Sequence, residues 1–99
     1  MEKVKITVLK RAQHDDLISL YENPIENPCE MNLGDVYFSF GECPDGFCKT
    51  AWQSVGPFAS ALANGEENFF DGWMKNPKSA MVSCNDGFRP VSFYLEVCE

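Results

Sequence analysis

Thiol groups are the side chains of this sequence with the widest chemical potential. Cys43 and Cys48 enclose the residues Pro-Asp-Gly-Phe and are followed by Trp52, and Cys84 opens the segment Cys-Asn-Asp-Gly-Phe-Arg-Pro. Together with Cys29, these thiols could supply four ligands to a tetrahedral zinc ion, which favours thiolates. The chain has no Cys-x-x-Cys pair, however, and an unpaired cysteine usually behaves as a small buried apolar residue. We therefore expect no bound metal and no cofactor.

Cys48 is the cysteine with the strongest case for reactivity. It lies near the start of a predicted helix, where the helix dipole stabilises a thiolate and so favours a nucleophile. The alternative is a packing role, in which Cys48 faces Trp52 across one helical turn. We favour packing, because cysteine is among the most often buried residue types. Cys84 shares the face of Ala80 and Val82 in a predicted strand and is expected in the core.

The remaining candidates for chemistry are a histidine and a charged turn. His14, the only histidine, precedes two aspartates and could act as a base, but no nucleophile is placed near it, so we expect a solvated loop residue. Asp86 and Arg89 flank a tight turn, where they can form a local ion pair or present the Arg89 guanidinium to an anionic ligand. The sequence contains no phosphate-binding glycine loop, nucleophile elbow or paired-histidine motif. With no catalytic motif, we expect a protein that is not an enzyme.

The cysteine-containing segments also resemble a family of short, uncharacterised microbial proteins. The likeness is carried by the opening Lys-Val-Lys-Ile-Thr-Val, by Asn-Pro-Cys ending at Cys29, by Gly-Phe-Cys-x-x-Ala-Trp and by Cys-x-Asp-Gly-x-Arg-Pro-Val, and it spans nearly the whole chain. The resemblance implies no activity. It singles out six positions as candidate ligand-binding residues: Cys29, Cys48, Trp52, Cys84, Asp86 and Arg89. Cys43 and Cys98 match nothing in this pattern, and Pro57 departs from the smoother helix that the resemblance implies.

Alternating apolar residues predict the strands that must position these residues. Residues 3–9 alternate, with Val4, Ile6 and Val8 on one face, and residues 36–40 form a second strand in which every other residue is apolar. Residues 79–84 and 91–98 flank the turn Asn-Asp-Gly and predict an antiparallel hairpin.

Helical spacing covers the middle of the chain. Residues 47–64 repeat apolar side chains every three or four positions, including Trp52, Val55 and Leu62, and end at an Asn-Gly stop. Pro57 falls inside this run and predicts either a kink or two short helices.

Two shorter stretches are also informative. Residues 13–21 predict a short helix, capped by Asp15 or Asp16, that turns its apolar side chains Leu17, Leu20 and Tyr21 inward. Residues 66–78 form a loop that is too apolar to be left in water, and we expect it to fold over the core or against a partner. Its apolar side chains are Phe69, Phe70, Trp73 and Met74.

The chain length and the element order predict a single domain over residues 1–99. At 99 residues, 44% of them hydrophobic, the chain can bury one core. We expect an α+β fold, in which a small, mainly antiparallel four-stranded sheet carries one main, kinked or divided helix on one face.

Charge and cysteine usage restrict partners and location. Of the net charge of −7, residues 1–11 contribute +3, from three lysines and one arginine against one glutamate, which leaves −10 for the remainder. An acidic surface repels phosphate, so we expect neither nucleic acid nor an anionic membrane as a partner. The N-terminus reads as a strand rather than a signal peptide, and five cysteines cannot all pair within the chain, so we expect a cytoplasmic protein with free thiols.

Two functional hypotheses remain, and the first ranks ahead. The chain is a small non-enzymatic binding or assembly module that forms a homo-oligomer, with the aromatic residues 69–74 and an edge strand at the contact and a small-molecule ligand as a further partner. Alternatively, it is a thiol-dependent redox or metal-binding protein that uses Cys48 with Cys29 or Cys84.

Overall fold

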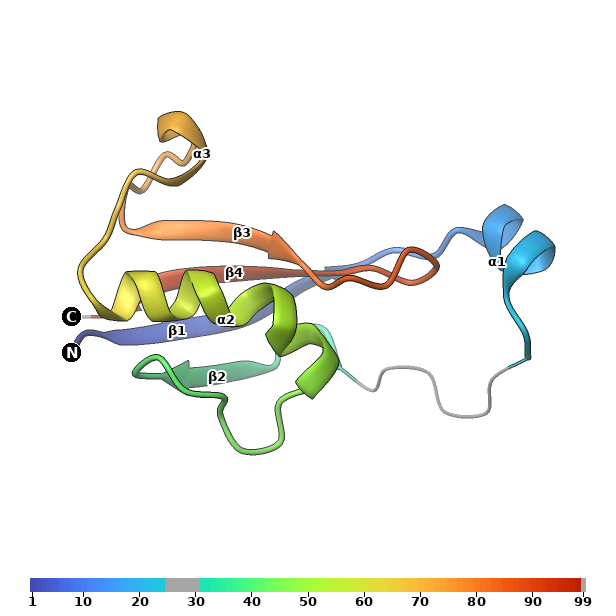
Figure 1. The fold of residues 1–99 in the computed structure, drawn as a ribbon, viewed down its shortest axis with the longest axis horizontal. Coiled ribbons are helices and arrows are strands. Elements are labelled where there is room, and N and C mark those ends of the chain that lie inside the picture. The colour runs from blue at the N-terminus through green and yellow to red at the C-terminus, as the bar shows by residue number, and fades with distance from the viewer. Residues whose placement is uncertain (25–30, 99) are drawn as a thin grey trace.

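A four-stranded sheet forms the centre of the fold. The structure is a computed structural model, and it describes residues 1–24 and 31–98. Its elements, in chain order, are β1 (Lys3–Arg11), α1 (Asp15–Tyr21), β2 (Val36–Ser39), α2 (Lys49–Ala63), α3 (Phe69–Gly72), β3 (Ser79–Ser83) and β4 (Val91–Cys98). The strands form one antiparallel sheet in the order β2-β1-β4-β3, with α2 across one face (Figure 1). The predicted α+β fold is confirmed.

Alternation in the two central strands produces the core. Val4, Ile6 and Val8 of β1 are buried toward α2, and the same face of β4 buries Phe93 and Leu95. Because successive side chains of a strand point to opposite faces, the residues between them lie on the other face of the sheet, which we call the open face. The register of β1 and β4 shifts between Val8 and Lys10, which marks an irregularity at Leu9.

Helix α2 packs closely on the sheet because its inner face consists mostly of small side chains. Ala51, Val55, Ala59 and Leu62 are buried there. Pro57 lies inside the helix and leaves it continuous, so the expectation of two separate helices is wrong. Figure 1 shows that the first turns of α2 point away from the direction of the rest, as a helix without the amide hydrogen bond of a proline permits.

Helix α1 forms where the sequence predicts it but does not turn its apolar residues inward. None of its residues is buried, and Leu20 and Tyr21 are 71% and 75% exposed. The predicted aspartate cap is also wrong, because His14 occupies the N-cap position and Asp15 lies in the first turn. Figure 1 shows the reason for the exposure: α1 lies beyond the hairpin loop, at the end of the molecule opposite to the termini, away from α2.

The aromatic loop over residues 66–78 divides into a packed part and an exposed part. The rings of Phe69 and Phe70 lie 5.6 and 5.4 Å from that of Phe58 in α2, so the loop does fold against the core as predicted. Trp73, which follows α3, is 81% exposed. Phe70 and Asp71 have left-handed backbone angles, with φ of 55° and 56°, which non-glycine residues rarely adopt.

The whole molecule measures 42 × 29 × 20 Å, and its long axis follows the strands toward α1. The described helices include none that is both long and apolar enough to cross a membrane.

Candidate functional site

Cys48 and Trp52 lie at the start of α2, as predicted. Cys48 is the N-cap residue, its carbonyl accepts the backbone N–H of Trp52 at 2.9 Å, and its side chain makes no capping hydrogen bond. Both side chains are half-buried and pack against the core. The Trp52 ring meets the buried ring of Phe47 edge-on at 5.7 Å, and Phe47 also contacts Phe93 at 5.3 Å. These contacts give Trp52 a packing role.

Cys84 closes the hairpin between β3 and β4. Its backbone N–H donates to the Val91 carbonyl at 3.0 Å, and the Val91 N–H donates in return to the Cys84 sulfur at 3.2 Å. The thiol thus takes the place of a backbone carbonyl as the acceptor at the last step of the ladder. The side chain is half-buried and packs against the core, although the sequence places it fully inside.

Asp86 and Arg89 organise the hairpin loop, but their side chains do not form an ion pair with each other. One Asp86 carboxylate oxygen, Oδ1, accepts the backbone N–H groups of Phe88 and Arg89 at 2.8 and 3.1 Å, which is the expected turn chemistry. The Arg89 guanidinium instead binds the Glu22 carboxylate at 2.6 Å. The local Asp86–Arg89 ion pair is therefore replaced by one that joins the loop to the end of α1, and a ligand-binding role of Arg89 stays a prediction.

The candidate cysteines do not form a metal centre in the part of the chain that the structure describes. Residues 1–24 and 31–98 contain no group of three or more histidine, cysteine, aspartate or glutamate side chains that could hold a metal ion. Cys29 lies outside the described residues, so its predicted place beside Cys48 or Cys84 has no structural description.

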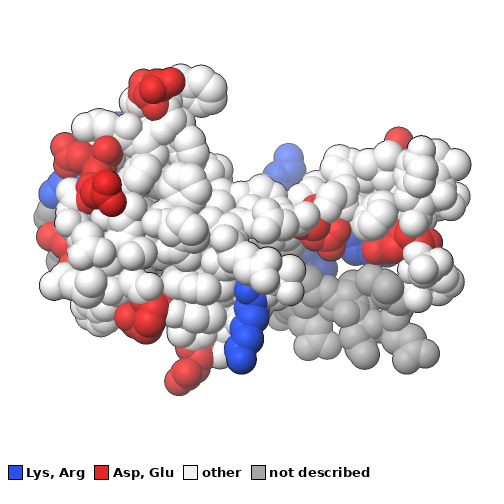
Figure 2. All heavy atoms as spheres, viewed as in Figure 1, with Lys and Arg blue, Asp and Glu red and all other residues white. Residues whose placement is uncertain are grey.

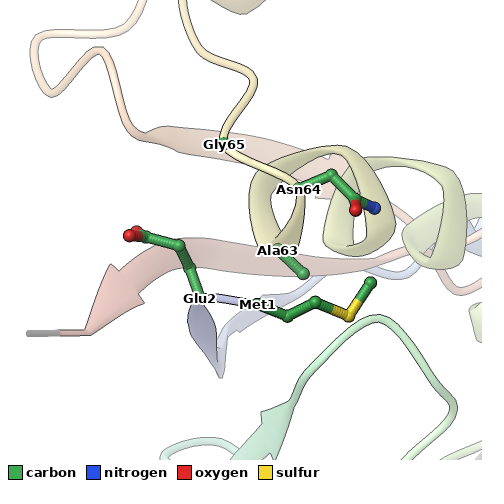
Figure 3. A pocket seen from close by; sticks show the side chains of 5 residues that line it. All are labelled: Met1, Glu2, Ala63, Asn64 and Gly65. Atoms are coloured by element: carbon green, nitrogen blue, oxygen red, sulfur yellow. The ribbon is translucent and has the colours of Figure 1, made fainter.

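A surface hollow lies where the N-terminus of the chain meets the end of α2. It has a volume of about 500 Å³ and is lined by Met1 and Glu2 on one side and by residues 63–65, the end of α2, on the other. In Figure 3 the Glu2 carboxylate and the Asn64 amide extend in opposite directions. The Asn64 amide nitrogen donates to the Ser60 carbonyl at 2.8 Å and so is used within the helix. With no converging polar groups, this hollow offers no arrangement for catalysis.

The open face of the sheet carries more apolar surface than sequence reasoning placed there. The register aligns Val36, Thr7, Tyr94 and Met81 in one row that crosses all four strands. Val36 and Met81 are 42% and 43% exposed, and Phe38, in the neighbouring row, is 47% exposed. In the sequence, the alternation over residues 36–40 indicates that alternate apolar side chains share one face of the strand. It does not indicate whether that face is turned toward the helix.

Charges on the open face are few and of both signs. Lys5 and Glu96 are register partners in the two central strands, next to the apolar row. Neither makes a salt bridge with another described residue. The Lys3 ammonium lies 4.4 Å from the centre of the Phe38 ring, a cation–π contact at the end of this face.

Charged side chains are distributed differently on the opposite side of the molecule, where α2 lies. Figure 2, viewed from the α2 side, shows acidic side chains spread around the outline of the molecule and mostly uncharged surface between them. The acidic charge that dominates the composition is therefore not gathered in one patch on this side.

Comparison of the chain with protein-family models, with curated proteins and with solved structures finds no match. The family resemblance of the cysteine-containing segments therefore stays an expectation.

Proposed function

We propose that this protein is a small non-enzymatic binding or assembly module that self-associates. One observation carries the proposal: the open face of the sheet exposes apolar side chains where an antiparallel sheet in water normally presents polar ones. Val36, Phe38 and Met81 are each more than two-fifths exposed, and they belong to the two edge strands, β2 and β3. Covering such a surface removes apolar area from water, which is the main driving force of association.

The edge strands themselves support association. Neither β2 nor β3 contains a charged residue or a proline, the devices by which exposed edges are usually protected from pairing. Trp73, at the end of α3, is a second exposed apolar side chain, and it belongs to the aromatic residues 69–74 that we expect at the contact. The proposal covers both surfaces.

A non-enzymatic role is supported by how the candidate side chains are used. Cys84, Asp86 and Arg89 each bind a neighbouring backbone or side-chain group, and Trp52 packs on Phe47. None of these described residues forms a nucleophile and base within hydrogen-bonding distance of each other. We keep a small-molecule ligand as a further partner, disfavour nucleic acid because of the net charge of −7, and place the protein in the cytoplasm on its free thiols.

Light scattering of the wild-type chain tests the proposal, at concentrations from about 10 µM to about 1 mM. We expect the average mass to rise above the monomer mass of 11.2 kDa as the concentration increases. Phe38→Asp should reduce the association, because it buries a charge in the contact. Leu20→Asp is the control, since it makes a comparable change at an exposed apolar residue of α1, away from the open face, and it should leave the mass unchanged. A wild-type mass that stays at 11.2 kDa throughout contradicts the proposal.

The alternative is a thiol-dependent redox or metal-binding protein, and the observation in its favour is that Cys48 occupies the N-cap of a 15-residue helix. This role requires a thiol that reagents can reach. Rapid and selective alkylation of native Cys48 at about pH 6, well below the usual thiol pKa of about 8.5, would favour the alternative. Stoichiometric zinc or iron in protein purified without added metal would favour it as well.

A further inference from the structure

We infer that two copies of this chain associate by stacking the open faces of their sheets, so that Lys5 of each copy faces Glu96 of the other. The inference rests on the proposed self-association and assigns its contact surface. The occupant of the open face is therefore a second copy of the same chain. Three features of this face support the assignment: its row pattern, its charges and its size.

The row pattern is compatible with a two-fold axis that runs parallel to the strands. The axis lies above the open face, midway between β1 and β4. Such an axis places β1 over β4 and β2 over β3 of the other copy. Residues of one row then meet residues of the same row, because a two-fold rotation allows no sliding along its own axis. Val36 faces Met81 of the second copy, and Thr7 faces Tyr94, so that the apolar row covers itself.

The charges next to this row complement each other in the same arrangement. Lys5 lies on β1 and Glu96 on β4 at one level of the sheet, so the axis brings each ammonium over the other copy's carboxylate. Both side chains are half-buried and without a salt bridge to any described residue of their own chain. A hollow of about 490 Å³ beside them, also lined by Asn76 and Lys78, leaves room for side chains to interdigitate. Of the other lysines near this face, Lys3 lies over the Phe38 ring, Lys10 lies toward the far end of β1, and Lys78 lines the same hollow as Lys5 and Glu96.

The size of the face predicts a weak dimer. Four strands about 4.8 Å apart, each paired over about five residues of about 3.3 Å, cover about 300 Å² in projection. Protruding side chains increase the accessible area, but the interface remains at the lower end of the range for specific complexes. We therefore expect dissociation constants in the range of about 10 µM to about 1 mM, with the two sheets aligned within about 30°.

A charge-reversal experiment tests this geometry by sedimentation equilibrium. Lys5→Glu places a carboxylate opposite the other copy's Glu96, and Glu96→Lys places an ammonium group opposite the other copy's Lys5, so that like charges face each other at both sites of the dimer. We expect each variant alone to dissociate, with a dissociation constant raised about tenfold or more. In an equimolar mixture of the two variants, every contact between copies again joins opposite charges, and we expect a heterodimer of near wild-type affinity. Within each chain the two positions still carry like charges, so recovery in the mixture reports only on contacts between chains.

Lys49→Glu and Glu67→Lys are the matched controls, because both residues are exposed, lie outside the open face and carry the same charge changes. Each of them alone should keep the wild-type affinity. Thermal unfolding of all variants verifies that they fold. If the wild type associates but the mixture of Lys5→Glu and Glu96→Lys stays dissociated, the stacked geometry is wrong while self-association stands. A wild type that is monomeric up to about 1 mM overturns both.

Discussion

Gly56 shows how tightly single residues are constrained where α2 meets the aromatic cluster. A Cβ atom at this position would lie 2.8 Å from the Trp52 ring nitrogen and 2.9 Å from the adjacent ring carbon Cε2. The missing side chain therefore makes space for the indole, and the position demands glycine through packing rather than through backbone angles.

Gly56→Ala should consequently destabilise the fold, although alanine is the better helix former. We expect a loss of about 1 to 2 kcal/mol in the free energy of unfolding, as the cost of displacing the indole exceeds the gain in helix propensity of about 1 kcal/mol. Denaturant unfolding of the wild type and the variant measures this change in the free energy of unfolding. In a Trp52→Ala background the same change should become stabilising, since only the propensity remains. A destabilisation of equal size in both backgrounds would show that the indole is not the cause.

Cys84 offers a second prediction for a single residue. Cys84→Ala removes the acceptor of the Val91 N–H and should cost about 1 kcal/mol of stability. Cys84→Ser keeps an acceptor at this position, so its loss should be smaller. Chemical denaturation of the two variants compares them directly, and equal losses would mean that the thiol acts by packing alone.

The ion pair of Arg89 is one of the connections that hold helix α1 against the hairpin loop. No residue of α1 is buried, so its position depends on connections at its ends, where the Arg89 guanidinium binds Glu22 and the His14 N–H donates to the Phe88 carbonyl at 2.8 Å. The Arg89 and Glu22 side chains are only 21% and 13% exposed, so loss of either partner would leave the other charge poorly solvated.

Glu22→Gln should therefore release α1 from the hairpin loop. We expect a loss of about 1 to 3 kcal/mol, confined mostly to this end of the molecule. Amide hydrogen exchange resolves the location, because exchange in residues 14–22 should accelerate more than exchange in β1 and β4. Asp16→Asn, an exposed acidic residue of the same helix, is the control. Uniform acceleration across the sheet would contradict the local role.

Pro57 is the feature of α2 whose removal is most informative. The residue is exposed and lacks the N–H that would bond to the Gln53 carbonyl, so it costs stability without contributing to the core. Pro57→Ala should raise the free energy of unfolding by about 1 to 3 kcal/mol. An unchanged or lower value in thermal unfolding would mean that the bend of α2 is needed for its fit to the sheet.

Elements with local signals could be predicted from the sequence, and their arrangement could not. The alternation of Val4, Ile6 and Val8 and the turn around Asp86 act over a few residues, and both are confirmed. The direction of Leu20 depends on where α1 lies, which follows from an ion pair between residues 67 positions apart. No local pattern specifies such a contact. For the same reason, the sequence revealed that alternate residues of β2 share a face but not that this face is open.

At the scale of the whole molecule, the sheet has one covered and one open face. Helix α2 covers the first, and the row through Thr7 and Tyr94 exposes apolar side chains on the second. The candidate residues that the structure describes lie in the hairpin loop and at the start of α2. The exposed apolar surface is formed instead by residues for which the sequence predicts only positions in strands.

Amide chemical shifts of the isotopically labelled wild type, followed during dilution from about 1 mM to about 10 µM, test self-association through the open face most directly. We expect concentration-dependent shifts centred on Lys5, Thr7, Tyr94 and Glu96 in the two middle strands, with little change in α1. Shifts that do not depend on concentration would contradict self-association, and shifts confined to residues 69–74 would contradict the open face as its contact.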